Sequence, residues 1–330
     1  MRRPRRVSRY LAAMLMAVCA VQQGLADDQK SPDKKKDPAE IGNRNVGRGV
    51  NFYSIPQEIA LGKKLAAAYA REVKLVTDPV VTEYVNRVGQ NLVRNSDAKV
   101  PFTIQVVDSD VVNATALPGG FFFVNSGVLL QAENEAELAG AMAHEIAHVA
   151  ARHGTRQATR AQIAQTATIP LIFMGGWPGF GVSQGANVLM PAVLLQFSRA
   201  FESEADLLGL EYMYKTGYDP SALVDFFERL ETLERRKPGA LSKVFATHPL
   251  TGDRMKAAQK NIRDYLKPRP DYVVTTSEFN DVKARMYALH DGRKLDPKDP
   301  NRPRLQRNPG QAEPGQDEDG RPSLKRRLAD

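Results

Sequence analysis

Cysteine is nearly absent from this chain of 330 residues, because Cys19 is the only one. A lone cysteine within an apolar N-terminal stretch leaves the rest of the chain without a disulfide, a thiolate nucleophile or a thiolate metal ligand. Apolar runs of transmembrane length, about 20 residues, are also missing. The sequence therefore excludes thiol chemistry in the body of the chain and predicts no membrane-spanning helix.

Acidic residues are missing from residues 1–26, which contain five arginines. This basic start precedes an apolar stretch over residues 11–21 and small residues up to Ala26, a pattern typical of a secretory signal peptide. We therefore expect an exported, periplasmic protein with cleavage after Ala26. Two alternatives stay open. Lipidation of Cys19 is disfavoured by the bulky Val18, and a mitochondrial transit peptide is disfavoured by the unbroken apolar centre.

The net charge of +8 would suit a nucleic-acid partner, but it is not carried by the body of the chain. Residues 49–290 contain 25 basic and 25 acidic side chains, so the surplus lies outside them. Neutralising phosphates requires surplus cations on one face of a protein. We therefore expect no nucleic-acid partner.

Composition divides the chain into four parts. Residues 1–26 form the signal peptide, and residues 27–50, rich in Lys, Asp and Gly, are expected to be a flexible linker. Residues 51–290 are expected to form the folded domain. Residues 291–330 contain six of the 21 prolines and both signs of charge, which predicts a disordered tail.

Apolar periodicity predicts a mostly helical α+β fold. Two helices are expected on either side of a break near Pro79, and a longer helix over residues 134–152, with Gly154 as its C-cap. The other expected elements are strands over 101–108, 121–124 and 272–275, and helices over 198–216, over 220–236 and up to about His290.

A His-Glu-x-x-His motif lies in the long predicted helix. His144 and His148 are one turn apart and differ by about 40° around the helix axis, so both can reach one tetrahedral Zn²⁺. Glu145 then stands beside them as the general base for a zinc-bound water. The alternative is a chance match on a surface helix, but neighbours such as Ala143 and Ile146 indicate burial. We predict one zinc ion per chain.

The third protein ligand must come from elsewhere. His153 is nine residues after His144, which places it on the opposite side of a continuous helix; we expect it to be a helix-end cation. Glu202 and Asp206 stand at i and i+4 on the next predicted helix, so Glu202 can bind the metal while Asp206 accepts a hydrogen bond from a ligand histidine. Glu204 should point away. The alternative is a solvated acidic face.

Three separated motifs together resemble one family of zinc peptidases. They are His144-Glu145-x-x-His148, Ser198-Arg199-x-x-Glu202-x-Glu204-Ala205-Asp206-x-x-Gly209 and Thr247-His248-Pro249-Leu250. The family is that of the CAAX prenyl proteases, which are gluzincins, and the chain is most similar to its soluble exported branch. The resemblance covers about residues 50–290.

The resemblance implies a gluzincin core with a small edge sheet beside the zinc helix. It also implies roles for single residues: His144, His148 and Glu202 bind zinc, Glu145 activates water, Asp206 supports a ligand, and His248 either blocks the metal or stabilises the oxyanion. Arg254 corresponds to an arginine near the substrate cleft. A capping role in a loop remains the alternative for His248.

We expect unfolded or misassembled envelope polypeptides as substrates, on the basis of the resemblance alone. They would pair as an added strand with a sheet edge formed by Phe121, Phe122, Phe123, Val124 and Asn125. A competing interpretation is a periplasmic chaperone or assembly factor with a latent zinc site closed by His248. A third is a mitochondrial inner-membrane protease.

The apolar segment 170–196 has two interpretations. It forms either a buried helical hairpin, or a lid or membrane-surface hairpin that makes the protein membrane-peripheral. The candidate partners are thus a membrane surface, contacted through residues 170–196, and the outer-membrane assembly machinery. The family branch has helical repeats after the protease core, and residues 291–330 replace them here.

Overall fold

The computed structural model describes residues 36–174, 197–236, 248 and 252–294. Two compact units divide after Met286, and the second adds only the last residues of one helix to the described part. The expected signal peptide, most of the apolar segment and nearly all of the expected tail lie outside the described residues. Among those described, no helix is long and apolar enough to cross a bilayer.

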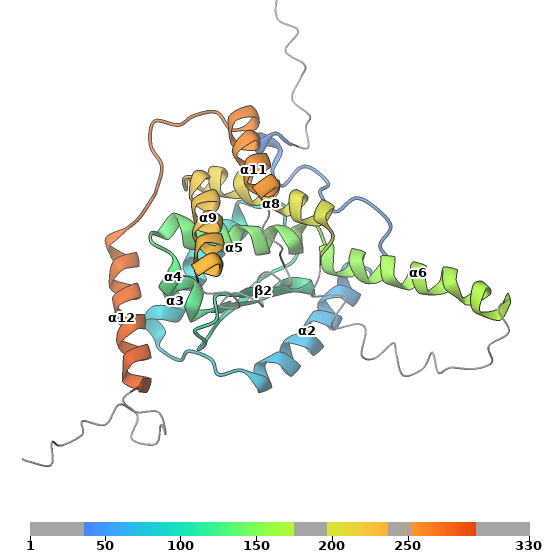
Figure 1. Ribbon diagram of the computed structural model, residues 1–330, viewed down its shortest axis with the longest axis horizontal. Helices are drawn as coiled ribbons and strands as arrows, with labels where there is room; N and C mark the ends of the chain where they lie inside the picture. The colour runs from blue at the N-terminus through green and yellow to red at the C-terminus, as the bar shows by residue number, and fades with distance from the viewer. Residues whose placement is uncertain (1–35, 175–196, 237–247, 249–251, 295–330) are drawn as a thin grey trace, which may run out of the picture. The chain divides into compact units, whose positions relative to one another are not determined.

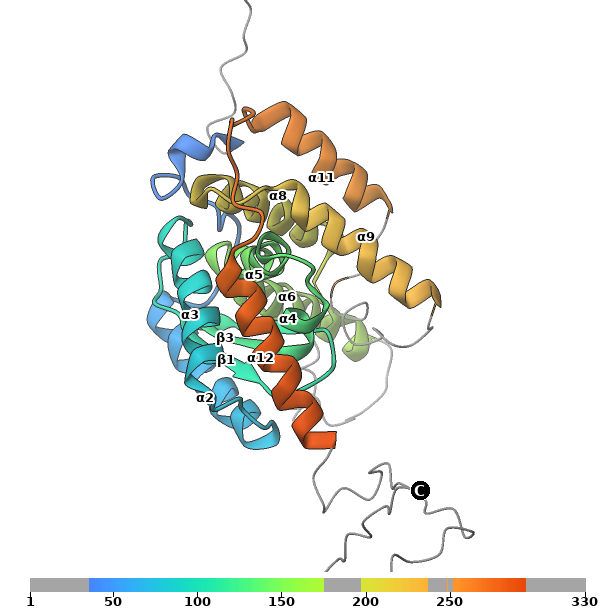
Figure 2. The same cartoon turned by 90° about the vertical axis from the view of Figure 1, so that its left-hand side faces the viewer.

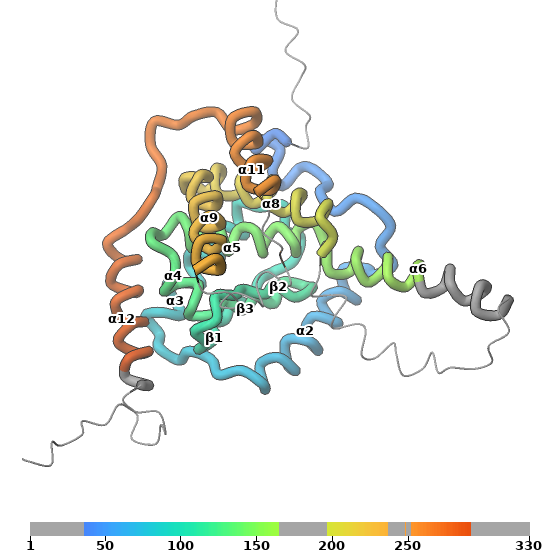
Figure 3. Tube along the Cα trace, viewed as in Figure 1, coloured from blue at the N-terminus to red at the C-terminus, as the bar shows by residue number. Residues whose placement is uncertain are grey.

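A three-stranded sheet has the order β1-β3-β2 (Figure 3). β1 (Thr103–Val107) pairs with β3 (Phe121–Asn125) in parallel, and β2 (Ala114–Leu117) pairs with β3 in antiparallel fashion. The short turn η3 (Pro118–Gly120) joins β2 to β3. Gly120 has φ +90°, and a Cβ there would lie 2.1 Å from the Pro101 carbonyl oxygen, so the turn needs glycine at this position.

The expectation that β3 is a sheet edge is wrong. β3 is the central strand, paired on both sides, so its backbone cannot accept an added strand. The side chains of Phe122, Phe123 and Val124 are buried. Such a continuous apolar run is typical of a central strand that is covered on both faces. The residues proposed for substrate pairing, Phe121, Phe122, Phe123, Val124 and Asn125, therefore belong to the interior of the sheet. In the described part of the chain, the edge nearest the long helix is β2.

The predicted helices before the sheet are confirmed. α2 (Ile55–Glu72) begins with a capping box between Ser54 and Gln57, and α3 (Pro79–Arg94) begins with Asp78 as N-cap and proline at its first position. Both are favoured N-terminal signals. α3 buries an apolar stripe against β1 and the long helix.

The long helix α5 (Glu135–Ala150) lies at the centre of the first unit. It packs against β2 on one side and against α8 (Arg199–Thr216) and α9 (Ser221–Arg236) on the other (Figure 1). Small residues make this close packing possible. A Cβ on Gly140 would lie 3.1 Å from the Cα of Leu223, and one on Gly209 would lie 3.2 Å from the backbone nitrogen of His144. All residues of α5 except Ala141 are buried.

Several elements differ from the prediction. The sequence patterns did not indicate α4 (Ser126–Gln131), α6 (His153–Met174) or α11 (Gly252–Tyr265), which packs on α8 and α9 (Figure 2). The strand expected over 272–275 is a single bridge between Tyr218 and Val273, and α12 (Ser277–Lys294) follows it. Gly154 does not cap α5 but lies in the first turn of α6.

Part of the expected linker is packed rather than flexible. η2 (Pro38–Glu40) precedes Arg44, whose side chain is buried and pairs with Asp97 at 2.9 Å and with Glu211 at 2.5 Å. The backbone N–H of Gly42 also donates to Asp97 at 2.7 Å. The polar composition predicted a solvated linker. It could not indicate the burial of Arg44, because its partners Asp97 and Glu211 are distant in sequence.

Candidate metal centre and active site

Two histidines of α5 face the interior one turn apart. His144 and His148 are both almost fully buried, and their Nε2 atoms lie 3.1 Å from each other. Asn134 caps the helix by accepting from the Glu137 N–H. This arrangement is the one that the spacing of the motif predicted.

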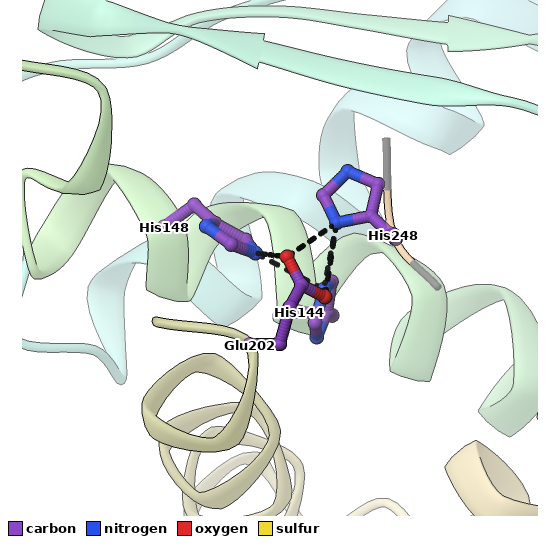
Figure 4. A group of neighbouring side chains, drawn as sticks. All are labelled: His144, His148, Glu202 and His248. Atoms are coloured by element: carbon purple, nitrogen blue, oxygen red, sulfur yellow. Dashed lines mark hydrogen bonds and ion pairs between the residues drawn. The ribbon is translucent and has the colours of Figure 1, made fainter. Parts of the chain in front are cut away.

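Helix α8 brings the carboxylate of Glu202 to these imidazoles. Ser198 caps α8, which places Glu202 in its first turn. The Glu202 oxygens lie 3.5 Å from the Nε2 atoms of both His144 and His148. Figure 4 shows this carboxylate surrounded by the rings of His144, His148 and His248.

His248 is the fourth member of the cluster. Its Nδ1 lies 3.0 Å from Glu202 Oε1, and its Nε2 lies 3.3 Å from Glu145 Oε1. One potential ligand atom each from His144, His148, Glu202 and His248 falls within 4.8 Å of the others. Three imidazoles and one carboxylate are the donor types that Zn²⁺ prefers, so the residues present fit this metal.

The charges around the cluster favour a cation. Burial opposes a charge on His144, but hydrogen bonds with Asp206 and Glu202 outweigh it and raise the pKa of His144 to about 9. Burial and the nearby His144 hold the pKa of His148 well below its usual range. Burial also favours the neutral form of Glu202, yet hydrogen bonds with His144 and His248 lower its pKa. At neutral pH the metal-free site thus holds an ionised Glu202, a neutral His148 and a protonated His144, whose proton a bound metal would replace.

Asp206 lies where the sequence placed it. Its Oδ1 is 3.1 Å from Nδ1 of His144. Burial alone would raise the pKa of Asp206, but hydrogen bonds with Arg254 and His144 lower it. An ionised carboxylate at this atom favours the tautomer of His144 that leaves Nε2 free for a metal.

Arg254 does not lie in a substrate cleft. Its side chain is buried, donates from Nε and Nη2 to Asp206 at 2.8 and 2.7 Å, and pairs through Nη1 with Glu202 at 2.9 Å. The guanidinium fork matches the planar carboxylate of Asp206 and binds it through two nitrogens. Arg254 was predicted to bind substrate, but the structure shows it bound to the carboxylates of Asp206 and Glu202.

His153 is not on the far side of the helix. Its side chain is fully buried, with Nδ1 3.0 Å from Nδ1 of His148 and Nε2 3.0 Å from Glu204. The prediction assumed a continuous helix, but α5 ends at Ala150 and Arg152 has φ +56°. Burial lowers the pKa of His153, although Glu204 opposes this shift, so a helix-end cation is also wrong.

The edge strand β2 lies against the general-base candidate. The backbone N–H of Ala116 points to Glu145 Oε2 at 3.3 Å, and Glu145 is buried. Asn113 bonds to β3 through its carbonyl, so by alternation the backbone groups of Ala114 and Ala116 face away from β3. Four residues are too few to show a period, but the resemblance to the family pattern predicts that Asn113-Ala114-Thr115 belongs to the substrate-edge strand, and Ala114 and Thr115 do lie in β2.

A cavity of about 50 Å³ opens beside Glu145 and His144. Its wall is mainly apolar, and the side chains come from the β2 region, α4, α5 and α9. The lining residues are Val112, Asn113, Ala114, Val128, Ala141, Phe226, Phe227 and Leu230, together with His144, Glu145 and His248. A volume of this size has room for about two to four waters.

Comparison with known proteins places these residues in one family. The sequence pattern described as Peptidase family M48 matches residues 79–262. The beta-barrel assembly-enhancing protease of Yersinia pestis is 30% identical over 251 residues, which are 72% of this chain and 50% of the relative. That of Escherichia coli (strain K12) is 27% identical over 298 residues, covering 87% and 58%.

A second group of relatives is mitochondrial. The mitochondrial metalloendopeptidase OMA1 of Schizosaccharomyces pombe is 33% identical over 182 residues, which are 54% of this chain and 52% of the relative. The chain thus spans between half and three fifths of the length of these relatives. The family resemblance of the three motifs is confirmed: since the match covers more than half of its residues, the chain belongs to peptidase family M48.

Proposed function

We propose that this chain is a zinc-dependent metalloendopeptidase that hydrolyses peptide bonds in unfolded or misassembled envelope proteins. The observation that carries the proposal is the position of Glu145, a buried carboxylate on the same helix as His144 and His148. These two histidines and Glu202 would hold the zinc ion. The names of the relatives, which include metalloendopeptidases, support the same activity.

When bound, zinc supplies Lewis acidity, which polarises the scissile carbonyl and lowers the pKa of water. The protein's part is proton transfer and placement. Glu145 takes the proton of the attacking water and passes it to the leaving amine. Glu145 is buried and lines a mainly apolar cavity, which limits the access of bulk water to it.

Substrate would bind as an extended strand along β2. The backbone groups of Ala114 and Ala116 face away from β3, so a substrate strand could pair with them once the Ala116 N–H leaves Glu145. Strand addition at such an edge selects unfolded chains. A side chain of that strand could then enter the apolar cavity beside Glu145. This places substrate pairing on β2, next to the strand that the sequence suggested.

His248 supports a second candidate function, that of a chaperone or assembly factor with a latent site. Its ring lies between Glu202 and Glu145, 3.0 and 3.3 Å from their oxygens, and so occupies the approach to the general base. In this form the protein would bind unfolded chains along β2 without cleaving them. Export to the periplasm is part of both proposals, and the basic, apolar N-terminal sequence supports it.

The test is hydrolysis of unfolded casein by the wild type and by Glu145→Gln, with zinc content measured in both. We expect the variant to keep its zinc and to lose activity by about 10²–10⁴-fold, the usual contribution of a general base. Glu228→Gln, on the exposed face of α9, is the matched control and should cleave like the wild type. Equal rates for Glu145→Gln and wild type would exclude the proposed mechanism, and an inactive wild type would favour the chaperone.

A further inference from the structure

His153 links a metal-site histidine to a carboxylate outside the cluster. Its Nδ1 lies 3.0 Å from Nδ1 of His148, and its Nε2 lies 3.0 Å from Oε2 of Glu204. The side chain has no exposed surface, so both ring nitrogens depend on these partners. The metal-site face of His148 is the opposite one, because its Nε2 points to Glu202 at 3.5 Å.

The hydrogen positions along this chain follow from the demands of a metal ligand. A cation binds the lone pair on Nε2 of His148, so the proton of this neutral ring must be on Nδ1. That proton is donated to Nδ1 of His153, which must therefore carry its own proton on Nε2. Glu204 accepts this second proton. Each hydrogen bond in the series His148, His153, Glu204 thus has one donor and one acceptor.

The fold constrains the orientation of the His153 ring. Its ring stacks on Phe201, with centroids 4.4 Å apart and planes at 17°, and Phe201 precedes Glu202 on α8. Glu204 is itself held by Nη1 of Arg156 at 3.1 Å, and Arg156 also donates to the carbonyl of Ala151 at 3.1 Å. The ring is therefore fixed by packing and at both nitrogens.

The backbone between α5 and α6 is bent to bring His153 inward. Arg152 has φ +56°, a left-handed conformation that is costly for a residue other than glycine. The side chain of Arg152 is anchored there by Glu58 at 2.7 Å and by the carbonyl of Tyr53 at 2.5 Å. Strain of this kind persists where the surroundings enforce it and commonly marks a functional site.

We propose that His153 is a positioning residue that, with Glu204, fixes the tautomer and ring orientation of His148 for metal binding. The inference rests on the proposed function, because it assumes a metal at His144, His148 and Glu202. It assigns the two histidines of the motif separate supports: Asp206 and Arg254 on His144, and His153, Glu204 and Arg156 on His148. It also changes the expectation for Glu204, which the sequence placed away from the site.

The decisive measurement is the zinc dissociation constant, obtained by competition with a chromophoric chelator. His153→Phe keeps the aromatic stack on Phe201 but removes both ring nitrogens, and partners of this kind typically contribute about 10–100-fold to metal affinity. We expect a loss of that size. His153→Gln, whose amide can accept from His148 and donate to Glu204, should recover most of it. His290→Phe, in the last turns of α12, is the matched control.

The outcomes separate this inference from the proposed function. A wild type that binds zinc, together with His153→Phe of unchanged affinity, overturns the role of His153 and leaves the metal site standing. A wild type that binds no zinc overturns both. If His153→Phe does not give the wild-type circular dichroism spectrum, Glu204→Gln is measured instead. Weaker zinc binding by Glu204→Gln supports the positioning role of His153 and Glu204, and unchanged binding overturns it.

Discussion

The guanidinium of Arg254 lies against the carboxylate of Glu202, with 2.9 Å between Nη1 and Oε2. The same side chain holds Asp206, so α11 supplies a permanent cation that neutralises two buried acids of α8 at the site. Zinc held by His144, His148 and Glu202 would add a second positive charge at this carboxylate. Arg254 and the metal therefore stabilise the same carboxylate. Losing one of them should lower the free energy of unfolding most when the other is also absent.

Arg254→Met should destabilise the metal-free protein strongly. The substitution keeps much of the buried volume but leaves Glu202 and Asp206 without their cation, and breaking a buried ion pair in this way costs about 3–5 kcal/mol. Urea denaturation after zinc removal measures this loss, which should be smaller when zinc is bound. Arg285→Met removes a half-exposed pair with Asp78 and should cost no more than about 1 kcal/mol. Equal losses for the two variants would show that Arg254 has no special role.

Glu202→Gln should lose zinc while keeping the fold. The amide has nearly the shape of the acid but carries no charge, and the remaining protein donors are imidazoles. We expect the zinc content after gel filtration to fall from about one per chain to well below half of that, since the proposed set of His144, His148 and Glu202 loses its one charged ligand and would hold zinc only if His248 took its place. Glu228→Gln again serves as the control. A variant that retains one zinc per chain would remove Glu202 from the ligand set.

The parts of the site predicted correctly from the sequence are those with local geometry. His144 and His148 are i and i+4 on one helix, as are Glu202 and Asp206, and helical periodicity alone sets the faces on which they lie. Both pairs are found facing each other across the α5 and α8 contact. Small and apolar neighbours such as Ala143 and Ile146 also predicted that this helix is internal.

The parts predicted incorrectly depend on tertiary structure. The bend at Arg152 is made by contacts with Glu58 and Tyr53, far away in sequence, so the inward position of His153 could not be read from helical periodicity. The order of the strands depends on a parallel pairing between β1 and β3, which no hairpin rule predicts. Arg254 was expected near the substrate cleft because of the family resemblance; its carboxylate partners lie on another helix, so no local pattern indicated them.

His248→Ala should make the metal easier to remove. The ring contributes Nδ1 to the cluster at 3.0 Å from Glu202, so its loss leaves one donor fewer. We expect release of zinc to a chelator to become roughly tenfold faster, equivalent to about 1.4 kcal/mol. Casein hydrolysis then shows which role the ring has, because activity rises if His248 blocks the site and falls if it stabilises the oxyanion. If neither release nor hydrolysis changes, His248 has no gating role.

Ala141→Leu should change which peptide bonds are cleaved. Ala141 is the one residue of α5 that is not fully buried, and it lines the apolar cavity beside Glu145. Added carbons there take the space that a substrate side chain would fill, and one methylene in such a pocket is worth about 1–3 kcal/mol, or 10–200-fold in kcat/KM. We therefore expect peptides with leucine next to the scissile bond to be cleaved at least tenfold more slowly, while those with alanine there change little. Ala67→Leu, on the exposed face of α2, is the control. A uniform loss on both peptides would show that the cavity does not receive a substrate side chain, because only a filled pocket discriminates by side-chain size.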